Sequence, residues 1–319
     1  MKFIDKDLKA VQEARVLMEE AAEAKKTLAL FEQKKLDRIA ACMMDALELK
    51  LEQLTEEAVR ETGYGDAKDQ LLQAKLLIKK MRKTLEPMKC VGVLSTDEAQ
   101  GVLEIGVPMG VIAAAAPAVS PVAAVLSAAV CAVKSGNAIV FAPHPRAVKT
   151  TVRTVHILEE AALEAGLVRG ALSCSETAAK EGAIELLSHP ETNLILNMGE
   201  RPLLEACSRT GCPVLYGGIA PGPVFIEKTA DISRAAACIT DSRGFNCGTG
   251  AGSPGKTVRS QHIWAERGPR RPGRGKAALA DRRSGKGGTD PSRGLFYDGD
   301  RTETADCVSG TGKRNGASG

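Results

Sequence analysis

Apolar residues between residue 6 and about residue 86 recur at the spacing of an α-helix. One apolar stripe contains Leu8, Val11, Leu17 and Met18, and a second, with steps of three and four, contains Leu36, Ile39, Cys42, Met43 and Leu47. The string Glu61-Thr-Gly-Tyr-Gly65 interrupts this pattern, which resumes over 71–81. The pattern predicts amphipathic helices that pack on their own domain; a docking peptide for a partner is the alternative.

The period changes between residues 90 and 240. Residues 101–107 alternate like a half-exposed hairpin strand, whereas 110–116 form a continuous apolar run, typical of a strand buried on both faces. Further strands are expected at 137–141, 171–174, 193–196 and 213–216, and helices at 121–134, 148–165, 176–187 and 202–209. This alternation predicts an α/β fold with right-handed crossovers and a doubly wound parallel sheet. Prolines and serines within 111–133 argue against a membrane span.

Ligands of such sheets bind at the carboxyl ends of the strands, where phosphates meet helix N-termini. The segments at these ends are 116–121 (Ala-Pro-Ala-Val-Ser-Pro), 142–146 (Ala-Pro-His-Pro-Arg) and 197–200 (Asn-Met-Gly-Glu). None contains the G-x-G-x-x-G of dinucleotide-binding loops. The three segments therefore mark a binding edge and leave the nature of its ligand open.

Composition separates the end of the chain from the rest. The 319 residues are 44% apolar but only 3% aromatic, which predicts an aliphatic, alanine-rich core. Residues 254–319 hold 14 Lys and Arg against 7 Asp and Glu, so this segment carries +7 while the whole chain carries +4. With 13 Gly, 10 Arg and few aliphatic residues, the segment is expected to be a disordered Arg/Gly-rich tail. Out-of-frame translation of a GC-rich gene is the favoured origin; an RNA-binding arm is the alternative, and no nucleic-acid partner is expected.

The nine cysteines contain no C-x-x-C pair, and the four histidines lie far apart. Reduced thiols and no metal site are expected. The charged start, MKFIDKDLK, has no apolar stretch of a signal peptide, so we expect a cytoplasmic protein without a membrane partner.

Residues 250–257 match the P-loop pattern G-x-x-x-x-G-K-T. A P-loop needs a buried strand before it and an apolar helix after it. The flanking residues are polar on both sides, and Pro269 soon follows. A chance match is therefore the favoured interpretation.

Several strings together resemble the aldehyde dehydrogenase superfamily, and in particular its CoA-acylating branch of acetaldehyde, propionaldehyde and microcompartment enzymes. They begin at Glu61 (ETGYG), Val107 (VPMGVI), Lys134 (KSGNAI), Pro143 (PHPRA), His189 (HPETNLIL) and Ile226 (IEKTADI). The resemblance covers about residues 6–253. It implies a Rossmann-like domain that binds NAD or NADP, with coenzyme A as co-substrate, a small aldehyde as substrate, homo-oligomers, and association with a bacterial microcompartment.

The resemblance also implies domain boundaries and site residues. Residues 1–90 would be the helical part of the cofactor-binding domain, 91–240 its Rossmann-like part, 241–253 the start of the catalytic domain and 254–319 the tail. The cofactor-binding residues it implies are Pro117, Ser120, Pro143, His144, Pro145, Arg146 and Gly199. In such enzymes a cysteine thiolate attacks the aldehyde, and an oxyanion hole stabilises the resulting alkoxide.

This sequence departs from the family pattern where chemistry occurs. The position of the nucleophilic cysteine is Ala251, and the nearest thiol is Cys247, four residues earlier. Ser120 stands at the position of the oxyanion-hole asparagine, and Gly199-Glu-Arg replaces Gly-Gly-Pro. We therefore expect an NAD-dependent CoA-acylating aldehyde dehydrogenase of doubtful activity, truncated or frame-shifted near Ser253. A non-catalytic scaffold that keeps the fold is the alternative.

Overall fold

The computed structural model describes residues 5–217, 223–227, 229–249 and 256–259. The chain divides into two compact units, 1–220 and 221–319. The first unit contains the sheet and most of the helices, and the second contains a short strand pair with one helix. The two units are described separately.

Four helices precede the sheet, as the helical periodicity predicts. They are α1 (Lys6–Leu28), α2 (Gln33–Glu48), α3 (Leu51–Thr62) and α4 (Ala67–Leu85). The side chains of Asp5 and Asp66 cap α1 and α4 by accepting backbone N–H groups of the first turn. Helix α3 ends at Gly63, whose φ of 71° is a conformation that glycine adopts without strain. Local capping residues thus fix where these helices begin and end.

Five parallel strands form the central sheet, in the order β5-β4-β3-β6-β7. They are β3 (Val111–Ala115), β4 (Ala138–Ala142), β5 (Leu172–Cys174), β6 (Thr192–Asn197) and β7 (Val214–Tyr216). Every residue of β3 and β4 is buried, as the continuous apolar runs predict. The doubly wound parallel sheet expected from the sequence is confirmed, and the chain reverses its direction of winding at β3.

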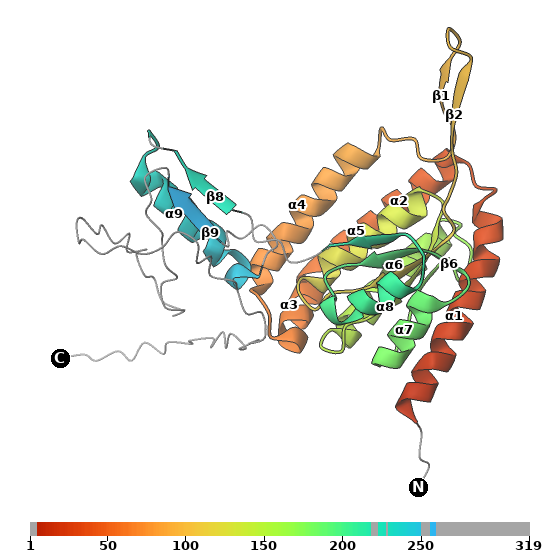
Figure 1. The fold of residues 1–319 in the computed structure, drawn as a ribbon, viewed down its shortest axis with the longest axis horizontal. Coiled ribbons are helices and arrows are strands. Elements are labelled where there is room, and N and C mark those ends of the chain that lie inside the picture. The colour runs from red at the N-terminus through yellow and green to blue at the C-terminus, as the bar shows by residue number, and fades with distance from the viewer. Residues whose placement is uncertain (1–4, 218–222, 228, 250–255, 260–319) are drawn as a thin grey trace. The chain divides into compact units, whose positions relative to one another are not determined.

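Helices cover both faces of this sheet (Figure 1). The crossover helices are α5 (Pro121–Lys134), α6 (Val148–Glu164), α7 (Lys180–Ser188) and α8 (Leu204–Arg209). Right-handed crossovers put α5 and α6 on one face, where they pack with α2, and α7 and α8 on the other, where α1 lies along α7. Alanines fill much of the interface, including Ala113 and Ala129, which allows helices to approach the sheet closely.

Two of the predicted helices begin later than the sequence suggests. The segment 176–187 becomes helical only at Lys180, because Glu13 of α1 accepts the N–H groups of Glu176 and Thr177 and holds them in an extended turn. The segment 202–209 starts as a 3₁₀ turn, η1 (Arg201–Leu203), before α8.

A hairpin of β1 (Gly92–Asp97) and β2 (Val102–Gly106) projects from the first unit (Figure 1). The strand expected at 101–107 is present as β2, but the prediction that one of its faces is buried is wrong. Apolar side chains on both faces of β2 are exposed, with Val102 at 48% and Ile105 at 57% of their maximal accessible surface. Alternation predicts one covered face, but the apolar side chains of both hairpin strands are exposed.

The second unit contains β8 (Pro223–Ile226), α9 (Ile232–Gly244), the 3₁₀ turn η2 (Phe245–Gly248) and β9 (Lys256–Arg259). Strands β8 and β9 pair in parallel. Strand β9, Lys256–Arg259, falls within the segment 254–319 that the sequence predicts to be a tail. Lys256 and Thr257 lie in a strand, whereas a P-loop needs a helix there. The rest of the predicted tail lies outside the described residues.

Within the described part of the chain, no helix is long and apolar enough to cross a membrane. The same residues contain no group of three or more His, Cys, Asp or Glu side chains arranged to hold a metal ion.

Candidate cofactor-binding site

The three segments expected to bind a ligand all follow strands on either side of the reversal point. Residues 116–121 follow β3, 142–146 follow its neighbour β4, and 197–200 end its other neighbour, β6. In open α/β sheets the crevice at this point is where ligands bind. The topology therefore brings the predicted loops together at one edge of the sheet.

Ser120 lies at the N-terminus of α5 in the left-handed region, with a φ of 47°. Few residues other than glycine and asparagine adopt this conformation readily, and such strain often accompanies a functional site. The Ser120 hydroxyl, which is nearly buried, donates to Oε1 of Gln73 on α4 at 3.1 Å. The side chain is thereby directed toward α4 in this structure.

The loop after β4 is held by its own histidine and by the loop between α3 and α4. The N–H of Arg146 donates to Nδ1 of His144 at 3.0 Å, so the proton of the neutral imidazole lies on Nε2. Burial, and then the charge of Arg146, lower the pKa of His144. The Arg146 guanidinium donates to the Tyr64 hydroxyl at 2.7 Å and lies 5.7 Å from the centre of its ring. Pro143 is buried, and Pro145 is exposed.

The loop after β6 is organised by Asn197, which is fully buried. Its Oδ1 accepts the N–H of Gly199 at 3.2 Å and the N–H of Glu200 at 2.7 Å, and its Nδ2 donates to the Glu200 carbonyl. Gly199 has a φ of 110°, and a Cβ there would lie 3.3 Å from the Gly217 carbonyl oxygen. A side chain at position 199 would therefore strain the loop and narrow the crevice.

Glu200 and His144 face each other across the end of β3. Glu200 Oε2 lies 3.7 Å from His144 Nε2, although the two residues follow strands that are not neighbours. Burial raises the pKa of Glu200 to about 7, while the pKa of His144 is lowered. Both shifts favour the neutral forms and oppose an ion pair, and a Glu200 pKa of about 7 means that this carboxyl group changes its charge near neutral pH.

The three loops lie at the sheet edge where open α/β sheets bind ligands, but some of their backbone N–H groups already have acceptors. Gly199 has no side chain to hinder close approach to the backbone, and the 117–120 and 143–146 loops follow the neighbouring strands β3 and β4. However, the N–H groups of Gly199 and Glu200, which could donate to phosphate oxygens, already donate to Asn197. An ionised Glu200 adds negative charge where phosphates would lie.

Cys247 belongs to the second unit, whereas the three loops belong to the first. Asn246 and Cys247 have φ values of 49° and 54°, and Gly248 continues the left-handed path at 72°. The Cys247 residue is exposed, and the Asn246 carbonyl accepts both the N–H and the hydroxyl of Thr249. Cys247 therefore stands on a sharply turned loop, and Ala251 lies outside the described residues.

Three residues of this region were not assigned to the site from the sequence. Glu200 and Gln73 carry no local signal of a contact with His144 or Ser120, because those contacts join distant segments. Tyr64 lies in the Glu61–Gly65 string, which the resemblance singles out, so its involvement could have been suspected.

The chain matches the aldehyde dehydrogenase family over residues 5–266. It is 31% identical over 239 residues to the bifunctional aldehyde-alcohol dehydrogenase AdhE of Escherichia coli K12, covering 75% of this chain and 27% of that protein. It is also 31% identical over 213 residues to the acetylating acetaldehyde dehydrogenase of Bilophila wadsworthia, covering 66% of this chain and 43% of that protein. The chain thus spans less than half the length of these curated relatives.

Solved structures with a similar fold are also aldehyde dehydrogenases. An acetylating aldehyde dehydrogenase from Geobacillus thermoglucosidasius superposes with a TM-score of 0.77 at 35% identity, covering 82% of this chain and 58% of that one. A propionaldehyde dehydrogenase from the fucose utilisation microcompartment of Clostridium phytofermentans superposes with a TM-score of 0.66 at 25% identity, covering 76% and 55%. Since a family match over most of the chain agrees with the fold, this chain belongs to the aldehyde dehydrogenase family and is an oxidoreductase by family.

Proposed function

We propose that this chain carries the NAD- or NADP-binding part of a CoA-acylating aldehyde dehydrogenase, which converts an aldehyde and CoA to an acyl-CoA. The observation that carries the proposal is the convergence of the 117–121, 143–146 and 199 loops at the reversal point of the sheet. Acetylating enzymes among the relatives support the acylating chemistry. A bound nicotinamide would accept hydride from the substrate; the steps below concern the chain's own residues.

The proposed cofactor contacts divide between the three loops. Pro117 and Ser120 border the crevice from β3, and Gly199 allows close approach from β6. Pro143, His144, Pro145 and Arg146 border it from β4. Arg146 is held by Tyr64, so we assign it a positioning role for this loop. His144 carries its proton on Nε2, because its Nδ1 already accepts a hydrogen bond, and this Nε2 faces Glu200.

The same proposal predicts little or no turnover. Ala251 stands where the family has its thiolate, and Ser120 replaces the oxyanion-hole asparagine while donating its hydroxyl to Gln73. Loss of one oxyanion-hole donor alone typically lowers the rate about a hundredfold to a thousandfold. Cys247 is the residue that could substitute as nucleophile, and its exposure permits a direct test.

Cofactor binding and turnover can be measured separately. Calorimetric titration with NAD should show weak binding that Gly199→Val abolishes, because valine is strained at this φ and fills the crevice. Gly211→Val is the matched control, since Gly211 also has a positive φ but lies before β7, at the other end of the sheet. Equal loss in both variants, or no NAD binding by the wild-type chain, contradicts the proposed site.

The turnover assay follows NADH formation from acetaldehyde or propionaldehyde with CoA. No rate above background is expected from the wild-type chain or from Cys247→Ala. A clear rate that disappears in Cys247→Ala would show that Cys247 acts as a relocated nucleophile.

We further propose that the substrate is a small aldehyde and that the chain forms homo-oligomers. Association with a bacterial microcompartment in the cytoplasm is supported by the propionaldehyde dehydrogenase neighbour, which comes from such a compartment.

A further inference from the structure

The loops after β4 and β6 meet over the end of β3, the strand that lies between them in the sheet. His144 from the first loop and Glu200 from the second face each other, with 3.7 Å between Nε2 and Oε2. Their side chains are mostly buried, at 23% and 18% exposure. The two side chains therefore close the sheet edge over the carboxyl end of β3.

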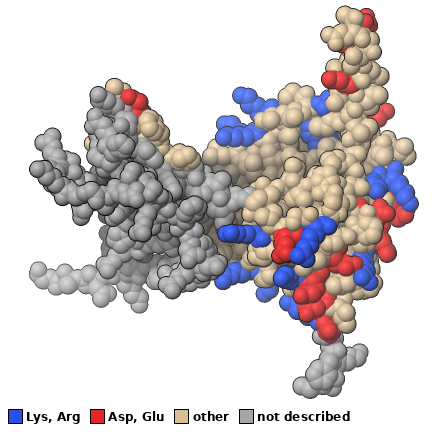
Figure 2. All heavy atoms as spheres, in the orientation of Figure 1, with Lys and Arg blue, Asp and Glu red and all other residues tan. Residues whose placement is uncertain are grey.

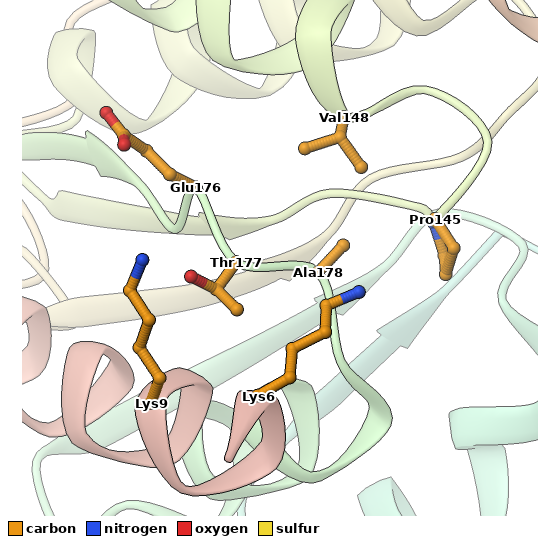
Figure 3. Close-up of a pocket in the computed structure, with 7 residues that line it drawn as sticks. All are labelled: Lys6, Lys9, Pro145, Val148, Glu176, Thr177 and Ala178. Carbon is orange, nitrogen blue, oxygen red and sulfur yellow. The ribbon is translucent and has the colours of Figure 1, made fainter. Parts of the chain in front are cut away.

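This contact occupies only one side of the loop after β4. On the other side, Pro145 lines a separate shallow pocket of about 370 Å³ together with Lys6 and Thr177 (Figure 3). Neither His144 nor Glu200 lines this pocket. The sheet edge thus has a hollow beside the end of β5 and a part over β3 that two side chains occupy.

The backbone on both sides of the contact is held in place. Asn197 accepts the N–H groups of Gly199 and Glu200 and donates to the Glu200 carbonyl. The N–H of Arg146 donates to the His144 ring. The contact between the two side chains, at 3.7 Å, is longer than the roughly 3 Å of an N–H···O hydrogen bond. The Glu200 side chain can therefore rotate away from His144 without the loss of a hydrogen bond between them, while its backbone stays in place.

The end of β3 is also where a dinucleotide has to pass. In open α/β sheets a dinucleotide binds across the point where the strand order reverses, which here is β3. An ionised carboxyl group at this place repels phosphates. The family pattern Gly-Gly-Pro has a glycine where this chain has Glu200. Glu200 thus adds both a side chain and a charge on the path of the ligand.

We propose that Glu200, in contact with His144, is an autoinhibitory latch, and that a dinucleotide binds only after the Glu200 side chain has rotated away from the end of β3. This inference rests on the proposed cofactor-binding function and deepens it, because it concerns how the same site is regulated. It makes the weak NAD binding of the wild-type chain a consequence of one side chain. Removal of that side chain should therefore strengthen NAD binding.

The test compares NAD binding by variants of the whole chain. Calorimetric titrations are run at pH 8, above the Glu200 pKa of about 7, so that most of these carboxyl groups are ionised. Glu200→Ala should bind NAD at least about tenfold more tightly than wild type, because both the contact and the charge are removed. The affinity of Glu200→Gln, which keeps the length of the side chain but not its charge, should fall between these two.

Glu159→Ala is the matched control. Glu159 Oε2 also lies 3.7 Å from a histidine nitrogen, Nδ1 of His156, and the Glu159 side chain is 24% exposed. Burial raises the pKa of Glu159 as it does that of Glu200. Both residues of this second pair lie in the interior of α6, and neither follows a strand of the sheet. NAD binding by Glu159→Ala should therefore match that of wild type.

The outcomes separate the latch from the function beneath it. NAD binding that Glu200→Ala leaves unchanged or weakens overturns the latch and leaves the cofactor site in place. An equal gain in Glu159→Ala also overturns the latch, because the gain would then not depend on the end of β3. Absence of NAD binding by all four chains overturns the latch and the proposed function together.

Discussion

At the scale of single residues, the environment of a side chain decides what it can do in this crevice. Glu200 is a carboxylic acid whose side chain is 18% exposed and whose nearest basic neighbour, His144, is itself held in the neutral form. Burial without a cationic partner favours the protonated acid. Glu200 therefore changes its charge near neutral pH, whereas an exposed glutamate does so near its ordinary value of 4.5.

The charge of Glu200 should make stability depend on pH. Its pKa is about 7 in the folded chain and about 4.5 when unfolded, so the folded chain binds the proton more tightly. Stability is then highest below pH 4.5 and falls as pH rises toward 7. Glu200→Gln should remove this fall in stability, because glutamine does not ionise. Urea unfolding at pH 5.5 and pH 8 measures the effect. Between these two pH values, the free energy of unfolding of the variant should rise by about 1 kcal/mol relative to that of wild type, a value reduced for partial solvent screening.

The exposed glutamate Glu52 on α3 provides the control. The free energy of unfolding of Glu52→Gln should change between pH 5.5 and pH 8 by the same amount as that of wild type. If the stability of Glu200→Gln also changes with pH as that of wild type does, then burial does not raise the pKa of Glu200.

At the scale of elements, one helix cap links the N-terminal helices to the sheet domain. Helix α6 begins after Ala147, which has no side chain to cap it. Glu61 of α3 accepts the N–H of Lys149 and both the N–H and the hydroxyl of Thr150, at 2.8, 2.8 and 2.6 Å. The first residue of the Glu61–Gly65 string thus has a structural role, and Tyr64 from the same string holds Arg146.

Removal of this cap should destabilise the chain without directly changing the crevice. Glu61→Ala should lower the free energy of unfolding by about 1–2 kcal/mol, because the first turn of α6 loses its acceptor and Thr150 is buried. Glu61→Gln, which retains one acceptor oxygen, should lose less. Chemical denaturation measures the change.

Glu56→Ala is the matched control, since Glu56 is exposed on the same helix. It should shift stability by less than about 0.5 kcal/mol. Equal effects of the Glu61 and Glu56 substitutions would mean that the contact with α6 contributes nothing and that helix propensity alone explains the loss.

At the scale of the whole molecule, the β1–β2 hairpin is an exposed apolar strand pair. Its apolar side chains Val93, Leu94, Val102, Leu103 and Ile105 are each more than 40% exposed. Figure 2 shows it as a mostly uncharged projection, whereas Lys, Arg, Asp and Glu are interspersed over the visible helices of the first unit. Exposed strands of this kind pair with other chains.

The hairpin should therefore drive self-association. Size-exclusion chromatography with light scattering should show species larger than a monomer, and Leu103→Lys with Ile105→Lys should shift them toward the monomer. Leu30→Lys with Leu49→Lys is the control, because both leucines are more than 80% exposed outside the hairpin. A clean monomer of the wild-type chain would contradict this prediction.

The end of the chain should be dispensable beyond β9. A chain that stops after Arg259 keeps the β8–β9 pairing, whereas one that stops at Ser253 loses it. We expect the first to match the full chain in melting temperature and cofactor binding, because residues 260–319 have too few aliphatic residues to form a core. A lower melting temperature for the chain ending at 259 would show that this segment stabilises the fold.

The sequence by itself determined the order and type of most elements of the first unit. Periods of 3.6 and 2 are local properties, so the helices α1–α4 and the strands of the sheet could be found from their own residues. Alternation of strands with helices then determined a parallel sheet with its ligand edge. The strings at that edge determined the family, and Ala251 at the expected cysteine position raised the question of activity.

Only the tertiary structure decided which distant residues meet and how they ionise. His144 and Glu200 follow strands separated by β3, Glu61 reaches the start of α6, and Lys6 reaches the end of β5. It also decided that β9 pairs with β8 and that the hairpin remains uncovered. The physical reason is that burial, pKa shifts and strand pairing depend on neighbours in space, which local periodicity does not specify.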